Sequence, residues 1–179
     1  MGKGRGLPCL KLFDTKKILT GLDIMTQKKL AIIVTKGSLD WAYPPFILAS
    51  TAAALDYEVQ MFFTFYGLSL LKKNLDLQIT SLGNPALPMP FPLPVVLQAL
   101  PGMQAITTHM MKRKMKSKGV ASIETLRDLC REAGVVFIGC QMTVDLFDYP
   151  PSEFIDGIVY GGAATYFAFA GSAEVNLFV

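Results

Sequence analysis

The chain has 179 residues, of which 51% are hydrophobic and 17% charged, and its formal net charge is +3. Such a chain can build one domain with a large core, and its composition excludes intrinsic disorder. The charge is weak and no basic stripe is interleaved with aromatic residues, which argues against nucleic-acid binding. The low charged fraction indicates surface buried in subunit contacts or against a membrane.

The cysteines and the single histidine exclude a zinc site. Cys9, Cys130 and Cys140 form no CxxC pair, and His109 is the one histidine. A zinc site needs about four ligands at recurring spacings, so we expect no metal. Scattered cysteines in odd number fit a reducing compartment better than a disulfide framework. The N-terminal stretch MGKGRGLPCLKLFDTKK lacks the apolar core of a signal peptide, so we expect a cytoplasmic protein.

The first half of the chain predicts two strands and two helices after an extension. Residues 1–28 have no clear period and are interpreted as an N-terminal extension before a single domain at 29–179. The run KLAIIV at 29–34 predicts a buried strand. A loop follows, and Pro44 and Pro45 stand where a helix can start, which predicts a helix over 46–57. EVQMFFTFYG predicts a strand at 58–67, and LSLLKKN predicts a short helix at 68–74.

The second half continues the alternation of strand and helix. SIETLRDLCREAG at 122–134 is the clearest helix, with a partial capping signal at Ser122. We expect its apolar face to contain Ile123, Leu126, Leu129 and Cys130. Strands are predicted at 135–139, within 156–162 and at 174–179, and a helix at 163–173. This order predicts an α/β fold of flavodoxin-like type: a doubly wound, five-stranded, mainly parallel sheet with helices on both faces.

One segment, 83–119, interrupts the alternation as a proline-rich, apolar insertion with a basic end. Its prolines disfavour a membrane-spanning helix, so we expect Pro85–Pro94 to be an extended arm over the body or a neighbouring subunit. Residues 95–116 predict a helix. Its expected apolar stripe is Val96, Leu100, Met103, Ile106 and Met110. Its basic residues either complement the helix dipole or contact an acidic partner or anionic lipid headgroups. They are Lys112, Arg113, Lys114, Lys116 and Lys118.

Cys140 is the main candidate for chemistry. It directly follows a predicted strand, at the sheet edge where open α/β folds bind ligands. It also precedes a helix that Thr143 is expected to cap, and the partial positive charge of a helix N-terminus favours a thiolate. The alternative is a buried small hydrophobe, and position alone leaves the two readings even. Cys130 on its apolar face favours packing, and nothing in the sequence orients Cys9.

Two further loops follow predicted strands and are candidate ligand or anion sites. Gly161 and Gly162 allow close backbone approach and can direct N–H groups toward the Cys140 edge, where Gly139 and Thr143 lie. The loop after the first strand occupies the usual place of a phosphate loop but lacks the GxGxxG and GxxxxGK[ST] patterns. Its candidate residues are Lys36, Gly37 and Ser38. We expect no bound cofactor.

Three stretches together resemble one known family. KLAIIVTKGSLDWAYPPFILASTAAALDYEVQMFFTFYGLSLLKK, FIGCQMTVDLF and IDGIVYGGAATY are similar to the DsrE/DsrF/DrsH-like family, in its longer subgroup often labelled peroxiredoxin-family. The resemblance spans about residues 29–179. It implies a flavodoxin-like fold, homo-oligomers, and sulfane sulfur carried as a persulfide on Cys140. It also implies TusA-like or rhodanese-like sulfur carriers as partners. The peroxidatic motif Pro-x-x-x-(Thr/Ser)-x-x-Cys is absent.

These observations lead to a first hypothesis and two alternatives. The first is a cytoplasmic sulfur carrier, similar to a sulfurtransferase, that holds sulfane sulfur on Cys140 and exchanges it with thiol partners. The second is a non-catalytic binding or scaffold subunit that docks a sulfur-handling complex or a membrane surface through 83–119, with Cys140 structural. The third is a flavin or nucleotide module.

Overall fold

The structure is a computed structural model, and it describes residues 27–80 and 102–179. Cys9, almost all of the expected extension, and the expected arm Pro85–Pro94 lie outside the described residues. The strands are β1 (Lys29–Val34), β2 (Glu58–Phe63), β3 (Val136–Cys140), β4 (Val159–Gly161) and β5 (Val175–Phe178). The α-helices are α2 (Leu39–Ala54), α4 (Met103–Ser117), α5 (Ile123–Glu132), α6 (Gln141–Leu146) and α7 (Ala163–Ala170). Two 3₁₀ helices are η1 (Phe65–Leu71) and η2 (Pro151–Glu153).

The five strands form one parallel sheet in the order β4-β3-β2-β1-β5. The first four strands add in one direction, and β5 returns to the free side of β1. This confirms the predicted α/β fold. All strands therefore end at the same edge of the sheet, and that edge collects the loops that follow β1, β2, β3 and β4.

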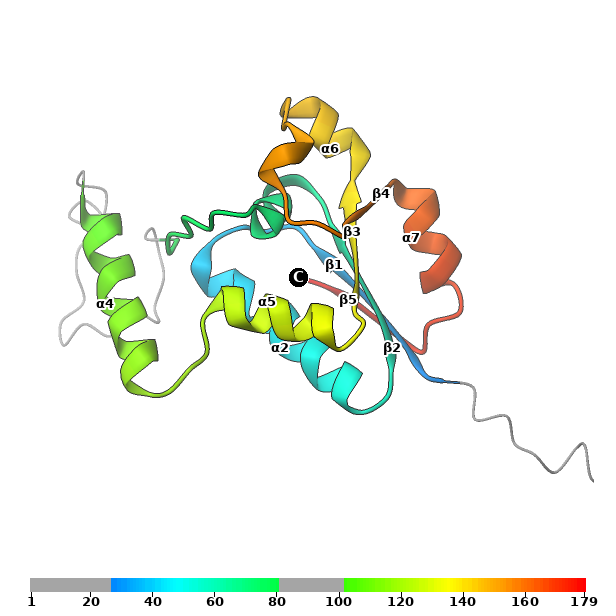
Figure 1. Ribbon diagram of the computed structural model, residues 1–179, viewed down its shortest axis with the longest axis horizontal. Helices are drawn as coiled ribbons and strands as arrows, with labels where there is room; N and C mark the ends of the chain where they lie inside the picture. The colour runs from blue at the N-terminus through cyan, green and yellow to red at the C-terminus, as the bar shows by residue number, and fades with distance from the viewer. Residues whose placement is uncertain (1–26, 81–101) are drawn as a thin grey trace, which may run out of the picture.

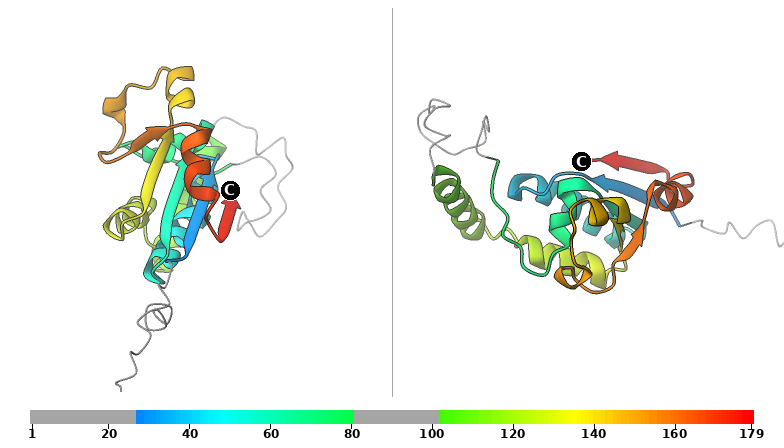
Figure 2. Two further views of the ribbon diagram at one scale, coloured as in Figure 1. Left: turned by 90° about the vertical axis from the view of Figure 1, so that its right-hand side faces the viewer. Right: turned by 90° about the horizontal axis from the view of Figure 1, so that it is seen from above.

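Helices cover both faces of the sheet (Figures 1 and 2). On one face, α2 and α5 pack side by side over a large core that includes Phe46, Phe63 and Phe137. On the other face, α7 packs through Tyr166 and Phe169 over a smaller core. Because side chains alternate along β3, Phe137 enters the large core while Cys140 enters the smaller one.

The helix after β1 begins earlier than predicted, at Leu39 rather than at Phe46. Pro44 and Pro45 therefore lie inside α2 instead of at its start. The first turn of α2, before the prolines, is helical because Leu39 and Ala42 are buried on the same side as Phe46, at helical spacing. Burial of this face outweighs the backbone bonds that the two prolines cannot make.

The second strand begins at Glu58, as predicted, but it ends at Phe63 and is followed by η1. The predicted end of the strand at residue 67 and start of the helix at residue 68 were therefore wrong. Phe65 has a φ of 47°, which no strand accommodates. Gly67 lies so close to β1 that a Cβ on it would be 2.3 Å from the carbonyl oxygen of Val34, and its N–H donates to the Thr35 carbonyl at 2.9 Å. This contact turns the chain across the end of β1.

The helix α5 confirms the prediction at 122–134, with one exception on its buried face. The Ser122 hydroxyl caps it by accepting a hydrogen bond from the Thr125 N–H at 3.2 Å. Leu129, expected to be buried, is exposed, and Arg127 is buried instead. The Arg127 guanidinium donates hydrogen bonds to the carbonyls of Leu70 and Lys72 at 3.0 and 2.7 Å. These bonds supply partners for carbonyl groups at the C-terminal end of η1.

The helix α4 lies to one side of the sheet and its covering helices (Figures 1 and 2). Its predicted apolar stripe was wrong within the described residues, because Ile106 and Met110 are exposed while Thr107 and Thr108 are buried. The Thr108 hydroxyl accepts a hydrogen bond from the Ile79 N–H at 3.0 Å, so polar contacts hold this helix to the preceding segment. No helix in the described ranges is long and apolar enough to span a membrane.

Candidate functional site at the end of strand β3

Cys140 is the last residue of β3 and the N-cap residue of α6. The prediction that Thr143 caps this helix was wrong, since Thr143 is the third residue of α6 and is fully buried. The sulfur therefore stands before the helix and faces N–H groups that have no partner within it. This placement puts a thiol where the backbone favours negative charge.

Thr143 links α6 to the end of β2. Its hydroxyl lies 3.2 Å from the Thr64 hydroxyl and accepts a hydrogen bond from the Phe65 N–H at 3.2 Å. The positive φ of Phe65 turns its N–H toward this hydroxyl rather than along the strand. Two neighbouring strand ends are thus tied together beside Cys140.

The donors around Cys140 change its acidity. Burial acts to raise the pKa of the Cys140 thiol, but hydrogen bonding outweighs burial and lowers it below its ordinary value. The donors are the hydroxyl and N–H of Thr143, the hydroxyl of Thr64 and the N–H of Met142. The thiolate is the nucleophilic form, so this environment favours reactivity. The Asp145 carboxylate accepts a hydrogen bond from the Gln141 side-chain amide at 2.7 Å.

The Cys140 side chain is nevertheless covered, with 4% of the residue exposed. It belongs to the smaller core with Phe62 and Tyr166. Gly139 is packed just before it, since a Cβ there would lie 3.3 Å from side-chain atoms of both Ile158 and Leu68. A donor molecule reaches this sulfur only when covering side chains are displaced.

Gly161 and Gly162 lie beside Cys140, as the order of strands requires. Gly161 is the register partner of Cys140 across β3 and β4. A side chain at Gly161 would clash with Thr165, because a Cβ there would be 2.6 Å from its hydroxyl oxygen. The Gly162 N–H donates to that same hydroxyl at 3.4 Å, within the first turn of α7. Their role as anion ligands stays a prediction.

Lys36, Gly37 and Ser38 line a separate cavity of about 650 Å³ after β1. Trp41, Tyr66 and Tyr149 share its wall, and the Lys36 ammonium lies 3.1 Å from the centre of the Trp41 ring. Gly37 is required here, since a Cβ would be 2.2 Å from the Tyr66 carbonyl oxygen. Cys140 is not among the residues that line this cavity, so the structure does not bring the two candidate sets into one site.

The second described cysteine has the opposite environment. Cys130 is fully buried in α5, and its thiol donates to the Phe46 carbonyl at 3.4 Å. Burial raises the pKa of Cys130 to about 11, against a smaller lowering by the backbone of Ser50. This agrees with the interpretation that Cys130 serves packing. His109 is exposed on α4, and the described residues contain no cluster of three potential metal ligands.

Thr64 and the aromatic pair beside it were not predicted from the sequence. The apolar run predicted a longer strand that contains Thr64, whereas β2 ends one residue before it. Tyr66 stacks on Phe147 with ring centres 6.1 Å apart, which joins η1 to the end of α6. A threonine directly after an apolar run was the available signal, because such a position lies at the carboxyl edge of the sheet.

Comparison with known proteins shows the family. The model of the DsrE/DsrF/DrsH-like family matches residues 26–178, and the chain belongs to this family. A relative named "Sulfur carrier protein DsrE2", from Allochromatium vinosum, is 68% identical over 159 residues, covering 87% of this chain and 100% of its own length. The uncharacterized protein YrkE of Bacillus subtilis is 32% identical over 158 residues, covering 85% of this chain and 97% of its own.

A solved structure shares the fold at low sequence identity. The crystal structure of the ychN protein from E. coli matches with a TM-score of 0.50 and 11% identity, covering 86% of this chain and 100% of that one. This similarity supports the fold alone.

Proposed function

We propose that this protein is a sulfur carrier that holds sulfane sulfur as a persulfide on Cys140 and exchanges it with thiol partners. The observation that carries the proposal is the group of hydrogen-bond donors that lowers the pKa of Cys140 at the start of α6. The relative that is 68% identical and named a sulfur carrier supports the same role.

The exchange is a thiolate displacement without net oxidation. The Cys140 thiolate attacks the terminal sulfur of a donor persulfide, R–S–SH. The bond between the two donor sulfurs breaks, a new sulfur–sulfur bond forms on Cys140, and R–S⁻ leaves with the electron pair. A second thiolate on an acceptor reverses the step. In the loaded state the negative charge is on the terminal sulfur of the persulfide. The hydrogen-bond donors that stabilise the Cys140 thiolate stabilise this charge too only if they move with the terminal sulfur.

Partners and assembly belong to the same proposal. The partners are persulfide-carrying proteins of the TusA-like or rhodanese-like kind, and the reaction takes place in the reducing cytoplasm. The protein acts as a homo-oligomer. The exposed side chains of Phe167 on α7 and Phe178 on β5 support this, because they offer an apolar surface for a second copy. Multi-angle light scattering of wild type and Phe178→Asp tests the assembly, and an unchanged mass rejects this surface as the interface.

The test of the carrier is intact-protein mass spectrometry in a Cys9→Ser background. After exposure to a persulfide donor we expect an added mass of one sulfur atom, removable by reductant. The same treatment of Cys140→Ser should give no addition. Equal addition to the Cys140→Ser variant, or none to the Cys9→Ser parent, rejects the proposal.

A second function is favoured by one observation, the coverage of Cys140. In that alternative the chain is a scaffold or binding subunit, and Cys140 only packs. Its docking element is the insertion 83–119, including the exposed Ile106 and Met110 and the basic residues of α4. Pull-down with a sulfur-carrier partner distinguishes the two functions. A scaffold should still bind the partner in the Cys140→Ser variant, and it should lose the partner when the insertion is deleted.

A further inference from the structure

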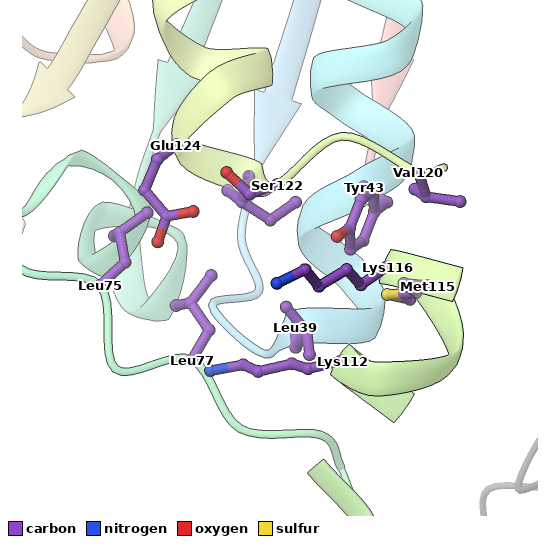
Figure 3. A pocket seen from close by; sticks show the side chains of 11 residues that line it. Leu39, Tyr43, Leu75, Leu77, Lys112, Met115, Lys116, Val120, Ser122 and Glu124 are labelled. Atoms are coloured by element: carbon purple, nitrogen blue, oxygen red, sulfur yellow. The ribbon is translucent and has the colours of Figure 1, made fainter. Parts of the chain in front are cut away.

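A second cavity lies between the outlying helix α4 and the body of the protein (Figure 3). Its volume is about 380 Å³. Three helices and two connecting segments form it: α2, α4, the N-terminus of α5, the connection between α4 and α5, and the segment after η1 that contains Leu75 and Leu77. Its lining residues are Leu39, Tyr43, Leu75, Leu77, Lys112, Met115, Lys116, Val120, Ser122, Ile123 and Glu124. None of them belongs to the Cys140 site.

The polar groups of this cavity favour an anion. Lys112 and Lys116 lie one turn apart on α4, and Figure 3 shows both side chains extending toward Leu77. Neither lysine pairs with a carboxylate within the described ranges. The N-terminus of α5, whose cap is Ser122, adds partial positive charge from a ten-residue helix. Glu124 is the one carboxylate in the lining, so two ammonium groups face one opposing charge.

The remaining wall is apolar, and this excludes a simple inorganic ion as the best fit. The apolar lining consists of leucine side chains from α2 and from the segment before α4, together with Met115, Val120 and Ile123. Leu39, Leu77 and Ile123 are buried, so the floor is continuous with the core. Burial, and then the Glu124 carboxylate, raise the pKa of Tyr43, which fits a sheltered position for this side chain. An apolar wall with convergent polar groups is the usual form of a small-molecule site.

We propose that this cavity binds an amphipathic anion, with its charged head between Lys112 and Lys116 and its apolar part against Leu39, Leu77 and Val120. The ligand is either a dissolved organic anion or an anionic lipid presented by a bilayer, and both have the same chemistry. Glu124 selects against a more highly charged head by repulsion. This site is independent of the sulfur chemistry at Cys140.

In the experiment, the full chain is titrated with decyl phosphate below its critical micelle concentration. Calorimetry measures the binding during the titration. We expect one saturable site, and binding of inorganic phosphate at least about tenfold weaker, because it leaves the apolar wall in water. The double variant Lys112→Gln/Lys116→Gln should weaken decyl phosphate binding about tenfold. Val120→Trp, at an exposed position, should block the cavity and abolish binding while the fold persists. Glu124→Gln should strengthen binding.

The matched control is Lys114→Gln/Lys118→Gln, which removes the same charge from the same helix outside the cavity. We expect it to change binding less than about twofold. Equal weakening by both double variants, or binding that persists in Val120→Trp, overturns the proposal. Sedimentation with phosphatidylcholine vesicles, with and without phosphatidylglycerol, identifies the source. Capture by anionic vesicles that Val120→Trp abolishes indicates a bilayer lipid, and no capture indicates a dissolved ligand.

Discussion

Cys130 and Cys140 are ten residues apart and almost equally covered, yet their surroundings act on the thiol in opposite ways. Burial raises the pKa of Cys130 to about 11. At Cys140 burial acts in the same direction, but hydrogen-bond donors outweigh it and lower the pKa. Exposure alone therefore does not distinguish a packing cysteine from a nucleophilic one. The number of donors that face the sulfur separates them.

The position of each cysteine in its helix explains this difference. Cys130 lies within α5, where backbone N–H groups already bond to carbonyls of the preceding turn. Cys140 precedes α6, so the N–H groups of Met142 and Thr143 are free of helical partners and face the sulfur. The threonine hydroxyls at the end of β2 and in α6 complete the set.

The largest expected difference is in alkylation by iodoacetamide at pH 8. A thiol with a pKa of about 11 is about one part in a thousand thiolate at this pH, whereas one with a pKa below its ordinary 9.0 is more than about a tenth thiolate. We expect Cys140 to react at least about 100-fold faster than Cys130. Peptide mass spectrometry after timed quenching measures both rates, and in denaturant they should become equal. Comparable native rates would contradict the comparison.

The next effect is on stability at alkaline pH. The folded Cys130 thiol keeps its proton to about pH 11, whereas the unfolded thiol loses it near pH 9. Its contribution is therefore fully present below pH 9 and is lost as pH rises toward 11. Between these values the wild type should lose up to about 2 kcal/mol more than Cys130→Ala, measured by urea unfolding. Parallel pH profiles for the two proteins would show that Cys130 keeps no elevated pKa.

A smaller effect is expected when one donor to Cys140 is removed. Thr64→Val keeps the side-chain shape but loses the hydroxyl, so the pKa of Cys140 should rise while that of Cys130 is unchanged. The alkylation rate of Cys140 at pH 7 should fall about fivefold. The matched control is Thr35→Val, which removes a hydroxyl that bonds to the Val179 carbonyl at the end of β1. An equal fall in both variants would assign the effect to stability rather than to hydrogen bonding.

Hydrophobic pattern predicted most of the fold, because strands buried on both faces read as continuous apolar runs. It located β1, β3 and α5 within two residues. It misplaced the start of α2, since local rules place prolines at helix starts while burial of Leu39 and Ala42 decides otherwise. It also extended β2 too far, because the turn at Phe65 depends on contacts with β1 and Thr143 that no local pattern contains.

The candidate site was predictable in its position but not in its chemistry. The end of a strand before a helix identified Cys140, and the parallel order placed Gly161 next to it. The donation by Thr64 comes from a residue 76 positions earlier, which only the folded sheet brings close. The coverage of Cys140 by the smaller core was likewise invisible, since it depends on which face of the sheet α7 packs against.

The most direct test of sulfur carriage on Cys140 compares persulfide occupancy at Cys130 and Cys140. A Cys9→Ser protein is loaded with a persulfide donor at pH 7, trapped with an alkylating agent, and mapped by peptide mass spectrometry. We expect a persulfide at Cys140, none at Cys130, and loss of the Cys140 persulfide when a thiol acceptor is added before trapping. Persulfide at Cys130, or a Cys140 that remains unmodified while the fold is intact, would contradict it.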